Sequence, residues 1–210
     1  MDREHPDKPF ARYADDAVVN CKTKEDAEEL RRSLEKRLAE CKLELHPTKT
    51  RIVYCKDDNR KGNYPENTFD FLGYTFRPRP AKNKFGMLFA SFIPAISNKA
   101  KVAIQQTIRD WRIHLMSDKT LKDISQEYNP KIRGWANYYG RFYKTGMYSI
   151  YHHLNLALIR WAMRKYKKLR AHKLRAHHWL ARIARQEPEL FVHWQMGIFP
   201  GAMDDGSRMS

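Results

Sequence analysis

The first part of the chain alternates short apolar runs with polar turns, a pattern typical of strands joined by loops. Residues 10–13 and 17–21 are rich in β-prone side chains and flank a short acidic turn, which predicts a hairpin. After Thr23, apolar residues recur at spacings of three and four, so we expect an amphipathic helix over residues 24–42 with Thr23 as its N-cap. Further strands are predicted at residues 51–55, 69–78 and 86–93.

From Ser97 onward the apolar period becomes helical, and Ser97 is placed to cap the first helix of this part. Pro130 stands where a helix could begin, because proline is favoured in the first turn. Residues 148–170 form a further helical stretch, and the basic segment 170–186 favours one more helix. The side chains predicted to face inward on the 148–170 stretch are Tyr151, Leu154, Leu158 and Trp161.

These elements predict an α+β fold, in which a helix packs on a mainly antiparallel sheet and a bundle of helices follows. We expect the mixed part to span residues 1–96 and the helical domain residues 97–170. Residues 171–210 are then a basic tail, and its end, which lacks apolar side chains, is expected to be disordered.

Charge is divided unevenly between these parts. Residues 1–96 hold 19 Lys and Arg against 16 Asp and Glu, whereas residues 97–210 hold 21 against 8. Such an excess, interleaved with tryptophan and tyrosine, is the electrostatic pattern of a protein that binds nucleic-acid phosphates. A merely solvated basic surface is the alternative, because net charge bears on association rather than on fold.

Cysteine usage and hydropathy limit the class of protein. The three cysteines are widely spaced and form no C-x-x-C pair, so neither a disulfide framework nor a zinc site is indicated. No apolar run is long enough to span a bilayer, and the polar N-terminus does not resemble a signal peptide. We therefore expect a soluble cytoplasmic protein without membrane contact, free or associated with the nucleoid.

Two adjacent carboxylates, Asp15 and Asp16, occupy the predicted hairpin turn. Like charges repel and aspartate is a poor strand residue, so folding alone gives little reason to place them together. A hard divalent cation such as Mg²⁺ takes carboxylate oxygens together with substrate phosphates, which suits phosphoryl transfer. The alternative is a plain acidic turn, since aspartate is common in turns.

Four blocks, in order, resemble one family. The stretch "YADD" at residues 13–16 is similar to the catalytic signature of reverse transcriptases, and "LELHPTKTRIV" at 43–53 looks like the lysine-bearing block that follows it. The stretch "FDFLGYTF" at 69–76 resembles the primer grip, and "IRGWANYYGRF" at 132–142 resembles the maturase-specific region of group II intron-encoded proteins. The late "ELFVHWQMG" also looks like tails of this family.

The resemblance implies roles for particular residues. Asp15 and Asp16 would be the catalytic carboxylates and metal ligands, with Asp16 the weaker or structural one, and the cofactor would be Mg²⁺. Lys49 would meet the triphosphate or protonate the leaving pyrophosphate, unless it is an ordinary solvated lysine. Contacts with the primer or the incoming nucleotide would come from Tyr13, Ala14, Phe71, Leu72 and Gly73. For Tyr13, Phe71 and Leu72, packing within the fold is the competing interpretation.

The helical part supplies the candidates for RNA binding. The helical spacing of Trp135 and Tyr139 favours packing in a core over base stacking. Basic side chains are the better candidates for phosphate contacts. They are Arg133, Arg141, Lys144, Arg164, Lys165, Lys167, Lys168 and Arg170.

The resemblance does not extend to a complete polymerase site. A two-metal polymerase site needs another aspartate from an upstream strand, and the residues before Phe10 leave no room for it. We therefore expect a fragment of a group II intron reverse transcriptase and maturase, inactive in DNA synthesis by itself. Its partners would be group II intron RNA, an RNA template with a DNA primer, and a separate N-terminal polymerase part. The alternative is an RNA-binding module that assists splicing without polymerase activity.

Overall fold

The computed structural model describes residues 8–60 and 62–201. These residues cluster into two compact units. The first unit contains the chain up to Phe71 together with Arg77–Phe92, and the second contains Leu72–Phe76 together with the chain from Ile93. The mixture of helices with a small antiparallel sheet confirms the predicted α+β class. No helix within residues 8–60 and 62–201 has the length and apolar character needed to cross a membrane.

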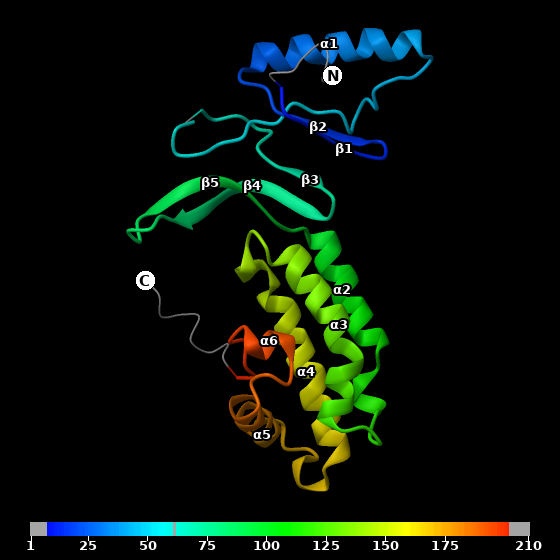
Figure 1. The fold of residues 1–210 in the computed structure, drawn as a ribbon, viewed down its shortest axis with the longest axis vertical. Coiled ribbons are helices and arrows are strands. Elements are labelled where there is room, and N and C mark those ends of the chain that lie inside the picture. The colour runs from blue at the N-terminus through cyan, green and yellow to red at the C-terminus, as the bar shows by residue number, and fades with distance from the viewer. Residues whose placement is uncertain (1–7, 61, 202–210) are drawn as a thin grey trace. The chain divides into compact units, whose positions relative to one another are not determined.

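The first unit begins with the predicted hairpin. Strands β1 (Phe10–Tyr13) and β2 (Asp16–Val19) pair antiparallel, with Tyr13 opposite Asp16 at the turn (Figure 1). Helix α1 (Lys24–Glu40) follows, and the Thr23 hydroxyl accepts a hydrogen bond from the Asp26 backbone N–H at 3.1 Å. The predicted helix and its N-cap are both confirmed.

The predicted strand at residues 51–55 is wrong. This segment has no regular secondary structure, although Tyr54 N–H donates to the Glu66 carbonyl at 2.8 Å. The Tyr54 ring lies 4.5 Å from that of Tyr64, and Arg51 forms an ion pair with Glu66 at 3.0 Å. The apolar run therefore does not pair with another strand. Its contacts with Tyr64 and Glu66 close the loop that follows it.

A three-stranded sheet comes next along the chain. Its strands β3 (Phe69–Phe71), β4 (Tyr74–Lys82) and β5 (Leu88–Ile96) are hydrogen-bonded in the order β3-β4-β5. The strand predicted at 86–93 corresponds to β5, whereas the single strand predicted at 69–78 is wrong in one respect, because a turn divides it into β3 and the start of β4. β3 and β4 are joined by only two residues, Leu72 and Gly73, which makes this connection a tight hairpin.

The second unit is helical. Its longer elements are α2 (Asn98–Asp110), α3 (Leu121–Tyr139), α4 (Tyr148–Lys165) and α5 (Lys173–Gln186). Its short elements are the 3₁₀ helices η1 (Ile113–Leu115), η2 (Lys144–Met147) and η3 (Lys167–Leu169) and the helix α6 (Val192–Gln195). Ser97 caps α2 as predicted, because its hydroxyl accepts the Ala100 N–H at 3.1 Å.

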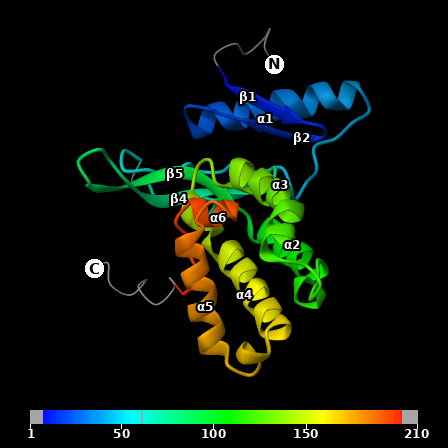
Figure 2. The same ribbon diagram turned by 60° about the horizontal axis from the view of Figure 1, so that its bottom comes forward.

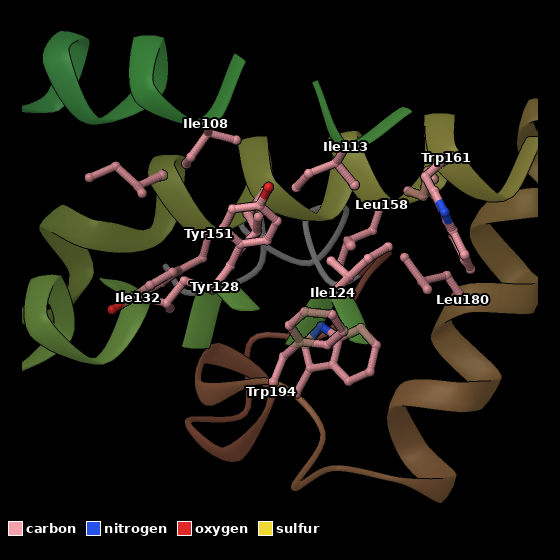
Figure 3. Packing of buried hydrophobic residues seen from close by; sticks show 14 of the residues in the cluster. Ile108, Ile113, Ile124, Tyr128, Ile132, Tyr151, Leu158, Trp161, Leu180 and Trp194 are labelled. Atoms are coloured by element: carbon pink, nitrogen blue, oxygen red, sulfur yellow. The ribbon is translucent and has the colours of Figure 1, made fainter. Parts of the chain in front are cut away.

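Helix α4 lies at the centre of this unit and contacts α2, α5, η1, η2 and η3. Figure 3 shows its side chains packed against those of the neighbouring helices. The four residues predicted to face inward are all buried. Burying such large apolar side chains is the main driving force for folding, so this unit has a substantial core of its own.

Pro130 does not open a helix, contrary to the prediction, because it lies inside α3. Proline removes one helical hydrogen bond, and in a helix interior this costs about 3 kcal/mol. Here the cost is offset by tertiary contacts on either side of it. Tyr128 and Ile132 are buried, and the Asn129 side chain donates to the Leu190 carbonyl at 2.9 Å and accepts the Val192 N–H at 3.2 Å.

The segment after residue 170 adds helix α5 as predicted, and this helix contributes to the core. Ala176, Leu180 and Ala184 of α5 are buried with Trp194 of α6 in the same cluster as α4. The division at residues 97 and 171 stays a prediction. The expected disorder at the chain end concerns residues 202–210, which lie outside the described residues.

Candidate metal site and nucleic-acid interface

The acidic pair lies at the hairpin turn between β1 and β2, where Ala14 and Asp15 form the two-residue loop and Asp16 is the first residue of β2. Ala14, the first residue of the loop, has a φ of +50°, a left-handed conformation that hairpins usually assign to glycine. The Arg12 side chain donates from Nε to the Ala14 carbonyl at 2.8 Å and so braces the loop. Asp15 and Asp16 are both exposed. The fold therefore presents two adjacent carboxylates at the tip of a backbone held in a sparsely populated conformation.

The chemistry of these ligands suits a hard divalent cation, since proteins commonly give Mg²⁺ one or two carboxylates and leave other positions to phosphates and water. No group of three or more His, Cys, Asp or Glu residues able to hold a metal occurs within the part of the chain that the structure describes. The hairpin thus offers two adjacent carboxylates, without a third candidate ligand grouped with them among the described residues.

Lys49 is exposed in the loop that follows α1. Its local turn is closed by a hydrogen bond from Thr50 N–H to the His46 carbonyl at 3.0 Å. No ion pair involving Lys49 is found among residues 8–60 and 62–201. Its ammonium group is therefore available to an anionic ligand.

The second tight turn, between β3 and β4, is anchored to the end of α3. Leu72 and Gly73 both have positive φ, at +50° and +78°. The Tyr138 hydroxyl donates to the Leu72 carbonyl at 2.9 Å, and Ser97 N–H donates to the Gly73 carbonyl at 2.9 Å. A Cβ on Gly73 would lie 2.9 Å from the Tyr139 hydroxyl oxygen, so only glycine fits without movement.

An aromatic cluster surrounds this turn. The Tyr74 ring lies 5.2 Å from Tyr138, 5.5 Å from Tyr139 and 5.8 Å from Phe142, and its hydroxyl donates to the Tyr138 carbonyl. Burial raises the pKa of the Tyr74 hydroxyl above its ordinary value, further from neutral pH. Trp135 stacks on Trp111 at 5.4 Å, so Trp135 and Tyr139 pack against other rings, as their spacing predicts.

Sequence reasoning missed the part of Tyr74 and Tyr138 in holding the turn. The only local signal is the pair of adjacent tyrosines after Trp135, and it does not reveal a contact with residues more than sixty positions earlier. Phe71 is half-buried, whereas Leu72 is exposed. Of the proposed primer contacts, Leu72 and Gly73 thus have backbone carbonyls held by hydrogen bonds, as Ala14 does through Arg12.

The basic candidates lie mostly at the surface of the helical unit. The exposed ones are Arg133, Arg141, Lys144, Arg164, Lys167, Lys168 and Arg170. Lys165 differs, because its ammonium group donates to the carbonyls of Ser117 at 3.0 Å and Lys119 at 2.6 Å. It ties the end of α4 to the loop before α3, so the fold already uses most of its donors.

The stretch between Glu127 and Glu187 contains no Asp or Glu, but it contains 14 Lys and Arg. It runs from the middle of α3 to the end of α5. Asp123 and Glu127 lie near Lys165 and Lys131, but the stretch itself contributes no acid, so its local charge is strongly positive. This pattern of cations suits the phosphates of a nucleic acid.

Comparison with known families agrees with this arrangement. A family model described as reverse transcriptase (RNA-dependent DNA polymerase) matches residues 1–76, and one described as group II intron, maturase-specific domain, matches residues 102–179. The two matches together support a group II intron reverse transcriptase/maturase, with this chain as its C-terminal region. The resemblance found in its motifs is thereby confirmed. Searches of curated proteins and of solved structures gave no match.

The two matches divide the candidate residues of this maturase between them. The reverse transcriptase match includes both tight turns and Lys49, and it implies a divalent metal cofactor. The maturase-specific match runs from α2 into α5 and includes all of the exposed basic candidates. Together they imply binding of intron RNA and of nucleic-acid substrates.

Proposed function

We propose that Asp15 and Asp16 bind Mg²⁺ in the polymerase site of a group II intron reverse transcriptase, which extends a DNA primer on an RNA template. The observation that carries this proposal is the exposed carboxylate pair on a braced hairpin loop. A bound Mg²⁺ supplies electrostatic stabilisation to the phosphoryl group that is transferred. The small side chain of Ala14 leaves room beside the carboxylates, and the left-handed Ala14 backbone fixes their direction.

Two further parts of the chain would position the substrates. The exposed ammonium group of Lys49 is suited to the triphosphate of the incoming nucleotide, since it is a compact charge without a carboxylate partner among the described residues. The Leu72–Gly73 turn would hold the primer strand through its backbone. The aromatic cluster around Tyr74 would hold the Leu72–Gly73 turn in place for this contact.

Because the described residues hold no group of three metal ligands, we propose that catalysis needs a further aspartate from an N-terminal polymerase part. The test is primer extension on an RNA template by the 210-residue chain, alone and mixed with an N-terminal reverse transcriptase segment that carries such an aspartate. We expect extension only in the mixture. In Asp15→Asn it should fall on the order of a hundredfold or more, because a metal ligand is lost.

Glu25→Gln is the matched control, since Glu25 is an exposed acid in the first turn of α1 and the change removes the same charge. It should leave extension unchanged. Metal-dependent extension by the unmixed chain would refute the need for a further aspartate. Full activity of Asp15→Asn in the mixture would refute the assignment of the metal ligands.

A second function, RNA binding in support of intron splicing, is favoured by the 14 Lys and Arg without an intervening acid. We propose that Arg164, Lys167 and Lys168 contact phosphates of the intron RNA. If about six phosphates are contacted, affinity should fall roughly a thousandfold between about 50 and 200 mM salt. Changing all three residues to Glu should weaken binding and reduce the salt slope by about three.

The control variant makes the same change of charge in the first unit. Lys22, Arg32 and Lys36 are exposed there, and changing them to Glu should affect RNA affinity far less. Equal losses in the two triple variants would mean that net charge alone drives binding. Affinity that does not respond to salt would contradict phosphate binding altogether.

A further inference from the structure

A cleft of about 750 Å³ opens where α4 ends and α5 begins. Figure 2 shows the two helices side by side, joined by a short connection at one end. The residues of the cleft used below are Tyr166, Lys167, Lys168, Arg175, Trp179 and Arg182. The volume is in the range of small-ligand sites in proteins, and it is larger than a single nucleotide needs.

Aromatic rings form one wall of this cleft. The rings of Tyr166 and Trp179 lie 5.0 Å apart, and the Trp161 ring meets Tyr166 edge-on at 5.9 Å. Trp161 is fully buried, and its Nε1 donates to the Met116 carbonyl at 2.8 Å, so it provides a fixed support for the Tyr166 ring. Tyr166 and Trp179 are each only partly covered. Such a rigid, partly exposed aromatic surface suits stacking of a nucleobase.

The rest of the lining is cationic. Lys167, Lys168 and Arg182 are exposed, and none of them forms an ion pair within residues 8–60 and 62–201. Arg175 donates to the Lys168 carbonyl at 3.4 Å and so joins η3 to α5 across the cleft. The cleft thus places aromatic rings, which can stack on a base, next to free cations, which can bind phosphates.

We propose that this cleft binds one unpaired nucleotide of the RNA, with its base against Tyr166 and Trp179 and its phosphates on Lys167, Lys168 and Arg182. The proposal rests on the proposed RNA-binding function and makes it specific. In an A-form duplex the base faces are stacked on one another and cannot reach a recessed ring, whereas a bulged or loop nucleotide can be turned outward. The cleft therefore distinguishes single-stranded features of the intron from its helices.

The experiment measures the affinity of the full chain for three hairpin RNAs at one salt concentration. One carries a single bulged adenosine, one carries an abasic nucleotide at the bulge, and one is fully paired. The abasic RNA keeps the bulge phosphate and removes only the base. We expect the adenosine bulge to bind at least about tenfold more tightly than either of the others, as loss of one stacked base usually costs that much.

Variants locate the effect in the cleft. Trp179→Leu should bring the three RNAs to similar affinity, while Tyr166→Phe, which keeps its ring, should retain the preference. Circular dichroism checks that Trp179→Leu is folded, and the abasic comparison in the unmodified chain does not depend on any variant. Equal binding of the adenosine and abasic bulges, or a preference that survives in folded Trp179→Leu, would overturn the proposal.

The outcome also separates this proposal from the one on which it rests. If the three RNAs bind equally but with strong salt dependence, phosphate binding stands and the nucleotide site fails. If none binds in a salt-dependent way, the proposed RNA-binding function fails as well.

Discussion

The two units of this maturase differ in how their functional residues are supported. In the first unit Leu30 is the only buried residue among those described, although this unit carries Asp15, Asp16 and Lys49. In the second, a continuous cluster of buried side chains extends from α2 to α6, and the basic residues lie on its outside. The proposed RNA-binding surface thus belongs to a region with a core of its own, whereas the hairpin proposed to bind metal has little buried surface to stabilise it.

The largest predicted effect comes from removing a central side chain of the second unit. Trp161 is fully buried and donates a hydrogen bond to Met116, so Trp161→Ala should lower the free energy of unfolding of this unit by about 3–5 kcal/mol. Chemical denaturation followed by circular dichroism measures the change. Val102→Ala, at an exposed position of α2, is the control and should change it by less than about 0.5 kcal/mol. Similar losses in both variants would contradict a core centred on α4.

Acid should destabilise the second unit through His193. This residue is fully buried, and burial lowers its pKa to about 3, while its Nε2 hydrogen-bonds to the Asn155 side-chain oxygen at 2.8 Å. The unfolded chain, with an ordinary histidine pKa near 6.5, binds a proton that the folded protein excludes. Stability should therefore fall as the pH drops from about 6.5 towards 3, by up to about 1.4 kcal/mol per pH unit from this group.

Comparison with His193→Gln isolates this contribution, because the carboxylates and the other histidines titrate in both proteins. His153 and His177, whose pKa values are also lowered by burial, act in the same direction and remain in the variant. Denaturation at several pH values should give a shallower pH dependence for His193→Gln. Identical slopes for the two proteins would show that His193 is protonated in the folded state.

A smaller effect tests the anchoring of the β3–β4 turn. Gly73→Ala has to fit a Cβ at positive φ and against the Tyr139 hydroxyl, while Gly197→Ala meets a similar φ of +81° with open space around it. Backbone strain should lower the free energy of unfolding of each variant by about 1 kcal/mol. The contact with Tyr139 should lower that of Gly73→Ala by about 1–2 kcal/mol more. Thermal unfolding compares the two. Equal losses of stability would mean that the Tyr139 side chain moves aside without an energetic cost.

The smallest predicted effect comes from removing an equivalent helix cap in each of the two units. The Thr120 hydroxyl caps α3 by accepting the Asp123 N–H, and Thr120 N–H donates in return to the Asp123 carboxylate, while Thr23 caps α1. Thr120→Ala should lower the cooperative unfolding free energy by about 1 kcal/mol. Thr23→Ala should leave that transition unchanged and increase amide exchange within α1 alone. If Thr23→Ala shifts the main transition as much as Thr120→Ala does, the contrast between the units is wrong.

Local patterns predicted most elements of the fold because their causes are local. Apolar spacing indicates α1, α2 and α4, and a hydroxyl before the first turn predicts the caps at Thr23 and Ser97. The acidic pair was also recognisable, since two adjacent aspartates between β-prone runs have few structural reasons to occur. In each case the residues that decide the outcome lie within a few positions of one another.

The features that sequence could not predict depend on contacts between distant residues. Helix α3 continues through Pro130 because Asn129 is bound by residues 190 and 192, and Lys165 is held by carbonyls more than forty positions earlier. The anchoring of the Leu72–Gly73 turn by Tyr138 spans a similar distance along the chain. The cleft between α4 and α5 likewise exists only once both helices are packed.

The absence of acids between Glu127 and Glu187 has a consequence for how the free protein behaves. Apart from Asp123 near Lys165, this stretch supplies no carboxylate to its cations, so the cations of α4 and α5 repel one another and oppose the packing of their helices. Salt should then have opposite effects, raising the melting temperature of the free protein while it weakens the RNA complex. RNA bound as proposed would take the place of salt, so it should also raise the melting temperature of the protein.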